Sequence, residues 1–109
     1  MWASAMRRAS TAGSAAFVGR LMPIASTSDA MVEAVVARAG KIDILVNGAA
    51  IFEMAPLVED TEASFDRQFG INVKGLMFTT QAVVRQMLKQ RAAGDSNRYK
   101  IIHLASQAG

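Results

Sequence analysis

The stretch Lys41-Ile42-Asp43-Ile44-Leu45-Val46-Asn47-Gly48-Ala49-Ala50 decides the fold of this chain. Its apolar run is broken only by Asp43, and such a run is typical of a strand buried inside a parallel sheet. The Asn-Gly pair that follows is a turn signal. Ligands of such sheets bind just past the carboxyl ends of the strands, so we expect Asn47–Ala50 to lie where a ligand would bind. A buried strand with a tight turn and no ligand fits the same residues.

The composition limits the chain to one small domain. With 109 residues, of which 51% are hydrophobic, it can form a single core and does not have a disordered composition. The absence of cysteine excludes disulfides and thiolate metal sites. No apolar run approaches the roughly 20 residues that are needed to cross a bilayer.

Charge is distributed unevenly along the chain. The net charge is +3, and the first 28 residues contain Arg7, Arg8 and Arg20 but no Asp or Glu. The remaining residues carry nine Lys or Arg and nine Asp or Glu, so the body of the chain is neutral. The basic balance therefore comes from the front end and does not indicate a nucleic-acid surface.

Residues 1–27 are expected to form a poorly ordered or non-homologous front end. Their composition is rich in Ala, Ser and Met and overlaps with that of a mitochondrial transit peptide, although an unstructured or mistranslated segment is the favoured interpretation. A short strand near Pro23 is the one element that the pattern suggests, from Phe17, Val18, Leu21, Met22 and Ile24.

From Ser28 onward the apolar pattern becomes regular. Ser28 can cap a helix, and Gly40 is a natural stop just past its end. After the strand at 42–46, the pattern indicates a loop over 51–60, a helix over 61–69, a long amphipathic helix over 71–91 weakened by Gly70 and Gly75, a polar connection over 92–98 and a strand over 99–105. This alternation is typical of a parallel α/β unit.

Three motifs on these elements resemble the short-chain dehydrogenase/reductase family. Asn47-Gly48-Ala49-Ala50 stands where the family has Asn-Asn-Ala-Gly, Asn72-Val73-Lys74-Gly75 matches its Asn-Val-x-Gly element, and Ile101–Ser106 matches the strand that ends in its catalytic serine. The resemblance covers residues 28–109, which would be the central part of a partial Rossmann-like domain: a doubly wound, parallel α/β fold. The Asn-x-Ala-Ala motif and Ala105–Gly109 are most similar to the bacterial sorbitol or polyol dehydrogenases.

The resemblance implies roles for five residues. Asn47, Gly48 and Ala49 would belong to the pocket for NAD or NADP, with Gly48 in place of the family's second Asn. Asn72 would hold a water in a proton relay, and Ser106 would hydrogen-bond the substrate oxygen as charge develops on it. Without the resemblance, a turn Asn, an exposed helix Asn and a capping or turn Ser account for the three polar residues.

Three further side chains lie near these motifs. We expect His103 to point along its strand into packing, with no part in catalysis. Phe52 and Met54 could line a substrate pocket, but ordinary burial is the favoured interpretation.

The family's cofactor loop and its base have no match in the sequence. Gly13 and Gly19 lack the spacing of the glycine-rich phosphate turn, and Ala25 and Ser26 occupy the region where an Asp would contact adenine. The family's base is the Tyr of a Tyr-x-x-x-Lys motif that follows the serine. The single tyrosine here, Tyr99, precedes the serine and has no Lys four residues on.

The favoured function is hydride transfer between NAD(P) and an alcohol or ketone, with a polyol such as sorbitol as the expected substrate. The chain would be an incomplete part of such an oxidoreductase and inactive alone, and the missing phosphate turn puts its cofactor binding in doubt. A non-catalytic truncated product or small interaction fragment is the alternative, and the neutral body disfavours a binding module built on the basic front end. We expect a cytoplasmic homo-oligomer with a small-molecule substrate and no nucleic-acid, membrane or metal partner.

Overall fold

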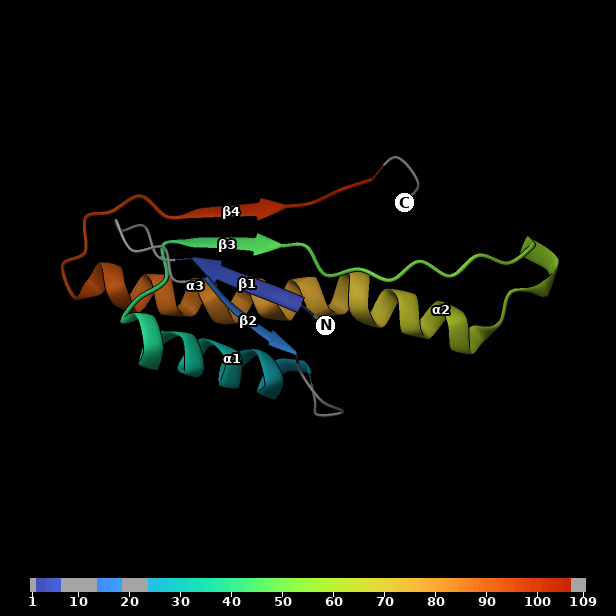
Figure 1. The fold of residues 1–109 in the computed structure, drawn as a ribbon, viewed down its shortest axis with the longest axis horizontal. Coiled ribbons are helices and arrows are strands. Elements are labelled where there is room, and N and C mark those ends of the chain that lie inside the picture. Colours follow the sequence, from blue (N-terminus) through green and yellow to red (C-terminus); the bar gives the residue numbers. More distant parts are fainter. Residues whose placement is uncertain (1, 7–13, 19–23, 107–109) are drawn as a thin grey trace.

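The computed structural model describes residues 2–6, 14–18 and 24–106 of the chain (Figure 1). Within these ranges the elements follow in the order β1 (Trp2–Met6), β2 (Ser14–Val18), α1 (Ile24–Ala39), β3 (Ile44–Asn47), the 3-10 helix η1 (Leu57–Glu59), α2 (Glu62–Phe69), the π-helix η2 (Gly70–Gly75), α3 (Leu76–Ala92) and β4 (Lys100–His103). The elements α2, η2 and α3 join into one continuous helical rod, which extends beyond the end of the sheet.

The strands β3 and β4 pair in parallel, with Leu45 opposite Ile101 and Asn47 opposite His103. A parallel pair needs a long crossover, because the chain must return to the end of the sheet at which the first strand began. The helical rod provides that crossover, so β3, the rod and β4 form the parallel α/β unit that the sequence predicts.

The sheet is larger than the sequence predicts, because β1 and β2 extend it in the order β2-β1-β3-β4. Both front strands pair antiparallel, β1 with β3 and β2 with β1. Their Ala-rich and Ser-rich sequences carry little strand signal, and backbone pairing with a neighbour does not require one. Of the residues predicted to form a strand near Pro23, Phe17 and Val18 form the end of β2, Leu21 and Met22 lie outside the described residues, and Ile24 begins α1.

Helix α1 begins earlier than predicted, at Ile24 directly after Pro23 and not at Ser28. Proline is well tolerated at the start of a helix, so Pro23 is the better start signal. Ser28 lies inside the helix, where it is 2% exposed and its hydroxyl is 3.3 Å from that of Thr79 on α3. The predicted stop is confirmed, since Gly40 has a φ of 84° and its N–H donates to the last turn of α1.

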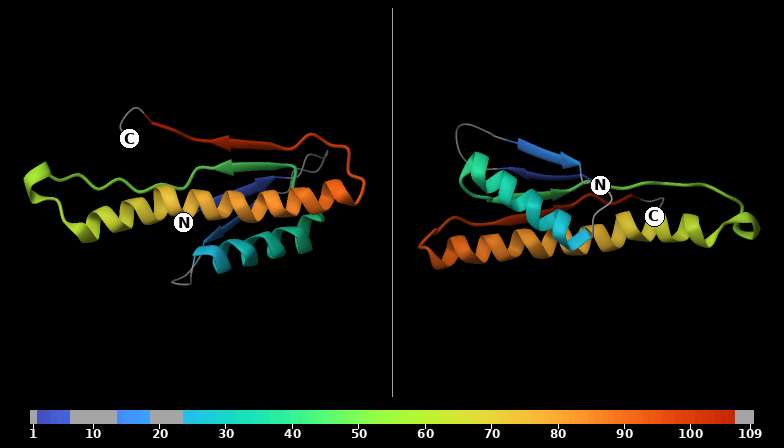
Figure 2. Two further views of the ribbon diagram at one scale, coloured as in Figure 1. Left: turned by 180° about the vertical axis from the view of Figure 1, so that it is seen from behind. Right: turned by 90° about the horizontal axis from the view of Figure 1, so that it is seen from below.

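Helix α1 and the rod pack side by side against one face of β3 (Figure 2). The buried apolar side chains of this core are Met31, Val32, Val35, Ile42, Leu45, Ala82, Val83 and Met87. Successive strand residues point to opposite faces, so Ile44 and Val46 point away from this core and are half-buried. On β4, Ile102 shares the face of Val46 and is 44% exposed. The described helices thus cover one face of the β3–β4 pair.

The rod changes its winding at two glycines. Helix α2 begins after Thr61, whose hydroxyl accepts a hydrogen bond of 3.1 Å from the Ser64 N–H. Between Gly70 and Gly75 the chain forms a π-helix, and α3 then continues. The sequence predicts a weak point at these glycines, and the structure shows that it takes the form of a wider turn. Neither the rod nor any other described helix has the apolar length that is needed to cross a membrane.

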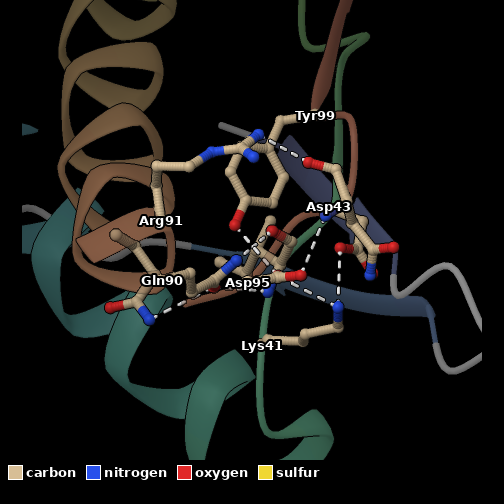
Figure 3. Close-up of polar contacts among 9 residues, drawn as sticks. Lys41, Asp43, Gln90, Arg91, Asp95 and Tyr99 are labelled. Atoms are coloured by element: carbon tan, nitrogen blue, oxygen red, sulfur yellow. Dashed lines mark hydrogen bonds and ion pairs between the residues drawn. The ribbon is translucent and has the colours of Figure 1, made fainter. Parts of the chain in front are cut away.

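A polar network fixes the amino ends of β3 and β4 (Figure 3). Lys41 Nζ lies 3.2 Å from Asp43 Oδ1 and 3.0 Å from Asp95 Oδ2, and the Tyr99 hydroxyl donates to the same Asp95 oxygen at 2.9 Å. Asp43 is 0% exposed, and Lys41 supplies the opposite charge that a buried carboxylate requires. A hydrogen bond from the Asn97 N–H, and then the Lys41 ammonium, hold the pKa of Asp95 below its usual value.

Candidate functional site

Asn47 joins the carboxyl end of β3 to helix α3 and to strand β4. Its side-chain Nδ2 donates to Thr80 Oγ1 on α3 at 2.9 Å and lies 3.1 Å from His103 Nδ1 on β4. Its carbonyl accepts a hydrogen bond of 3.0 Å from the Leu104 N–H. Asn47 is 6% exposed, and a buried amide must be hydrogen-bonded. Asn47 therefore does more than form a turn, because it joins three elements at one point.

The two residues after Asn47 expose backbone at this edge of the sheet. Gly48 is exposed and Ala49 is half-buried. A Cβ atom on Gly48 would lie 3.1 Å from Leu104 Cδ1, which is tighter than ordinary packing allows. The glycine therefore lets Leu104 lie against the backbone at the position where the family motif has a second asparagine.

Asn72 holds the segment that leads away from β3. Its Oδ1 accepts from the Ile51 N–H and its Nδ2 donates to the Ile51 carbonyl, both at 2.9 Å. Asn72 lies within the π-helix η2, and π-turns occur frequently at functional sites. An Asn inside a helix otherwise competes with the backbone for hydrogen bonds, and Ile51 gives this one a partner outside the helix. The alternative of an unbonded, exposed helix Asn is therefore wrong.

A second clamp on the same segment has no counterpart in the sequence analysis. Glu53 receives two hydrogen bonds of 3.0 Å from the Arg67 guanidinium and one of 2.6 Å from the Ser64 hydroxyl. The Arg67 guanidinium, and then the Ser64 hydroxyl, hold the pKa of the Glu53 carboxyl below its usual value. Because the two charged residues are fourteen positions apart, their opposite charges are all that the sequence offers to predict this contact.

Ser106 reaches the same edge of the sheet from β4. It lies three residues beyond His103, on an exposed stretch that continues the strand. Because β3 and β4 are parallel, their carboxyl ends lie at the same end of the sheet. This arrangement brings Asn47 and Ser106 to that end. Asn72 is joined to that edge through Ile51. Asn47 thus ends β3, Gly48 and Ala49 follow it, and Ser106 follows β4. Asn72 is bonded to Ile51, four residues beyond β3.

Three nearby side chains differ from the sequence analysis. The expectation that His103 lies in packing is wrong, because the side chain is exposed and lies against the Asn47 amide. The favoured burial of Phe52 and Met54 is also wrong, because 65% of Phe52 and 84% of Met54 is exposed. Both residues belong to the stretch between β3 and η1, which runs along the rod beyond the sheet (Figure 1), away from the core that α1, β3 and α3 form.

This edge of the sheet is open beside a fixed side chain. The exposed backbone of Gly48 and the small side chain of Ala49 leave the carboxyl end of β3 accessible, and the hydrogen-bonded Asn47 fixes its position. Among the described glycines, Gly40 and Gly94 have positive φ angles, and both lie at the opposite end of the sheet.

Comparison with known proteins agrees with this geometry. The profile of the short chain dehydrogenase family matches residues 2–109. The chain is 54% identical over 72 residues to the sorbitol dehydrogenase of Cereibacter sphaeroides, which covers 66% of this chain and 26% of that protein. It is 52% identical over 81 residues to the galactitol 2-dehydrogenase of Agrobacterium fabrum, which covers 74% of this chain and 30% of that protein. The chain belongs to the short chain dehydrogenase family.

Solved structures of the family share the fold. A short chain dehydrogenase from Mycobacterium avium superimposes with a TM-score of 0.72 at 25% identity, covering 79% of this chain and 31% of that one. Another from Mycobacterium smegmatis gives a TM-score of 0.67 at 28% identity, covering 78% and 33%. The predicted fold class, a partial Rossmann-like α/β domain, is therefore confirmed. The chain spans between a quarter and a third of the length of these relatives.

Proposed function

We propose that the protein is an oxidoreductase that transfers hydride between NAD or NADP and an alcohol or ketone. The observation that carries this proposal is the position of the two motif asparagines. Asn47 and Asn72 hold the two ends of the short segment that leaves β3, at the edge where open α/β sheets bind their ligands. Membership of the short chain dehydrogenase family supports the same chemistry.

Each predicted site residue has a role in this proposal. Asn47, Gly48 and Ala49 would form one wall of the cofactor pocket. A bound nicotinamide would supply the hydride chemistry. Asn72 would hold a water that carries a proton, from a position that its bonds to Ile51 fix. The Ser106 hydroxyl would donate to the substrate oxygen as that oxygen gains negative charge.

A polyol is the proposed substrate class. The relatives at 54% and 52% identity are named for sorbitol and for galactitol, which are both polyols. The Asn-x-Ala-Ala motif with Phe52 after it, and the run from Ala105, are the residues on which this narrower similarity rests. A cytoplasmic homo-oligomer is the proposed form of the full enzyme.

The 109-residue chain is proposed to be inactive by itself. Its sequence has no Tyr-x-x-x-Lys after Ser106 and no glycine-rich phosphate turn, so proton transfer and cofactor binding both lack a component. Residues 28–109 would be the central part of the enzyme domain, preceded by residues 1–27, which contribute β1 and β2 to its sheet. A non-catalytic interaction fragment is the second candidate, and it is favoured by the strong exposure of Leu57 (92%) and Val58 (91%).

A chimera tests the proposed function. Residues 28–109 replace the matching part of the Cereibacter sphaeroides sorbitol dehydrogenase, and NADH formation from NAD and sorbitol is measured. We expect an active enzyme in which Ser106→Ala lowers kcat by about 100-fold to 1,000-fold, the usual loss for one oxyanion donor. Ser96→Ala, in an exposed connection, is the matched control and should leave kcat unchanged.

Two outcomes would contradict the proposal. One is a folded chimera without activity, and the other is a Ser106→Ala variant as active as Ser96→Ala. The proposed inactivity of the isolated chain has its own test. NADH formation by the 109-residue protein above that of its Ser106→Ala variant would show that this part is wrong.

A further inference from the structure

His103 and Thr80 share one side-chain group of Asn47. The Asn47 Nδ2 lies 2.9 Å from Thr80 Oγ1 and 3.1 Å from His103 Nδ1, so β3, α3 and β4 meet at this amide. Asn47 is buried whereas His103 is exposed, so the imidazole can exchange protons with solvent while its partner stays enclosed. His103 is the single histidine of the chain, and histidine ordinarily titrates between about pH 5 and 8.

The three side chains allow two complete hydrogen-bond arrangements on the same heavy-atom positions. With a neutral imidazole, the Asn47 NH2 group donates to His103 Nδ1 and to the Thr80 hydroxyl. With a protonated imidazole, Nδ1 carries a hydrogen and faces that NH2 group as a second donor. A half-turn of the amide removes this conflict, because its oxygen then accepts from the imidazolium and from the Thr80 hydroxyl.

We propose that His103 is a positioning residue for the turn after β3, and that protonation of its imidazole turns the Asn47 amide over. The group that Asn47 directs away from its two partners then changes from an oxygen to an NH2 group, at the edge where the cofactor is proposed to bind. This consequence for the cofactor rests on the proposed function, whereas the turnover rests on the three side chains. The backbone bond from the Leu104 N–H to the Asn47 carbonyl persists, so β3 and β4 stay paired in both states.

The parts of β3, α3 and β4 around the imidazole carry no other charged side chain. Residues 44–52, 75–84 and 101–106 contain no Asp, Glu, Lys or Arg, and β1, on the far side of β3, contains none either. The nearest charged residues along these elements are Asp43, Glu53, Lys74, Arg85 and Lys100. Of these, Asp43 and Lys100 lie at the amino ends of the two strands, opposite to the Asn47 end. These segments therefore place no charged side chain beside the imidazole.

Nuclear magnetic resonance of the 109-residue chain, without cofactor or substrate, tests the proposal. The His103 ring and the Asn47 NH2 group are followed between about pH 5 and 8. We expect the Asn47 NH2 resonances to shift with the midpoint of the His103 titration, and to stop responding to pH in His103→Gln. The Gln90 NH2 group is the internal control, because it donates to the Ile42 backbone and should not follow the titration. Asn47 resonances that stay constant while the imidazole titrates would overturn the proposal.

Thermal unfolding gives a second measurement that needs no assigned resonances. If the amide turns over, Asn47 keeps a partner in both protonation states, so Asn47→Ala should lower the Tm equally at both ends of this pH range. A loss that disappears at the acid end would mean that the bond breaks without being remade, and would refute the turnover. Neither measurement uses cofactor or substrate, so a failure here is distinct from a failure of the chimera assay.

Discussion

Gln90 holds the backbone of Ile42 with both ends of its side-chain amide. Its Oε1 accepts from the Ile42 N–H and its Nε2 donates to the Ile42 carbonyl, both at 2.8 Å. Gln90 is 8% exposed and Ile42 is 0% exposed, so water cannot replace these bonds. Helix α3 is therefore joined to Ile42, two residues before β3 begins. This contact lies at the amino end of the strand, whereas the proposed site lies at its carboxyl end.

Replacing Gln90 by Met should lower the free energy of unfolding by about 2–4 kcal/mol, because a buried N–H and a buried carbonyl of Ile42 lose their partners. Denaturant unfolding measures this change. Gln81→Met, at an exposed position on the same helix, should change it by less than about 0.5 kcal/mol. Equal effects of the two substitutions would show that the Gln90 bonds do not stabilise the fold.

Replacing Asn72 by Ala should release the segment that follows β3. The Ile51 N–H loses its acceptor, so its hydrogen exchange should accelerate about fivefold or more, as expected for one hydrogen bond of about 1 kcal/mol. Asn97→Ala is the control, because the hydrogen bonds shown for Asn97 use its backbone. Unchanged exchange at Ile51 in Asn72→Ala would contradict the clamp.

The Glu53–Arg67 pair should weaken in acid. Arg67 is the main reason that the folded-state pKa of Glu53 lies below the ordinary 4.5, so the pair contributes stability above pH 4.5 and loses it as the pH falls through the folded value. Arg67→Gln should raise the Glu53 titration midpoint toward 4.5 in carboxyl NMR. Arg85→Gln removes the exposed 3.7 Å pair with Asp29 and should leave that midpoint in place. Equal midpoints in both variants would exclude Arg67 as the cause.

The uncovered face of β3 and β4 should drive association of the isolated chain. Ile102 is 44% exposed there, and β4 is an edge strand of the sheet that the described residues form; such edges promote pairing between sheets. Size-exclusion chromatography should therefore show an assembly larger than a monomer, and Ile102→Lys should reduce its size. Val58→Lys, on the 3-10 helix far from the sheet, is the control and should not. A monomeric parent chain would contradict this expectation.

The parallel unit could be predicted because its signals are local. The apolar runs before Asn47 and Ser106 indicate strands, and the helical periodicity between them indicates the crossover. The position of Asn47 could be predicted because it directly follows an apolar run. The position of Asn72 could be predicted because it lies between the two glycines of the rod. Pro23 and Lys41 were also readable signals: the first marks the helix start, and the second lies two residues from buried Asp43, on the same side of an extended chain.

The remaining features depend on contacts between distant segments. Strand β1 is defined by backbone pairing for which its sequence gives no signal, and in β2 only Phe17 and Val18 indicated a strand. The clamp on Glu53 requires α2 to lie beside the chain that leaves β3, and the contact between Asn47 and His103 requires the register of two strands 56 residues apart. Exposure of Phe52 follows from the length of the rod, which carries that segment beyond the core.

The two amide clamps also tie the length of the rod to the length of the chain beside it. Gln90 and Asn72 lie eighteen residues apart on the rod, and their partners Ile42 and Ile51 lie nine residues apart on the chain beside it. Eighteen helical residues rise about 27 Å, and nine extended residues span about 30 Å. The two distances agree, so both clamps can form at the same time. An inserted or deleted residue in either stretch would bring one clamp out of reach, which makes both lengths a shared constraint on how this sequence can vary.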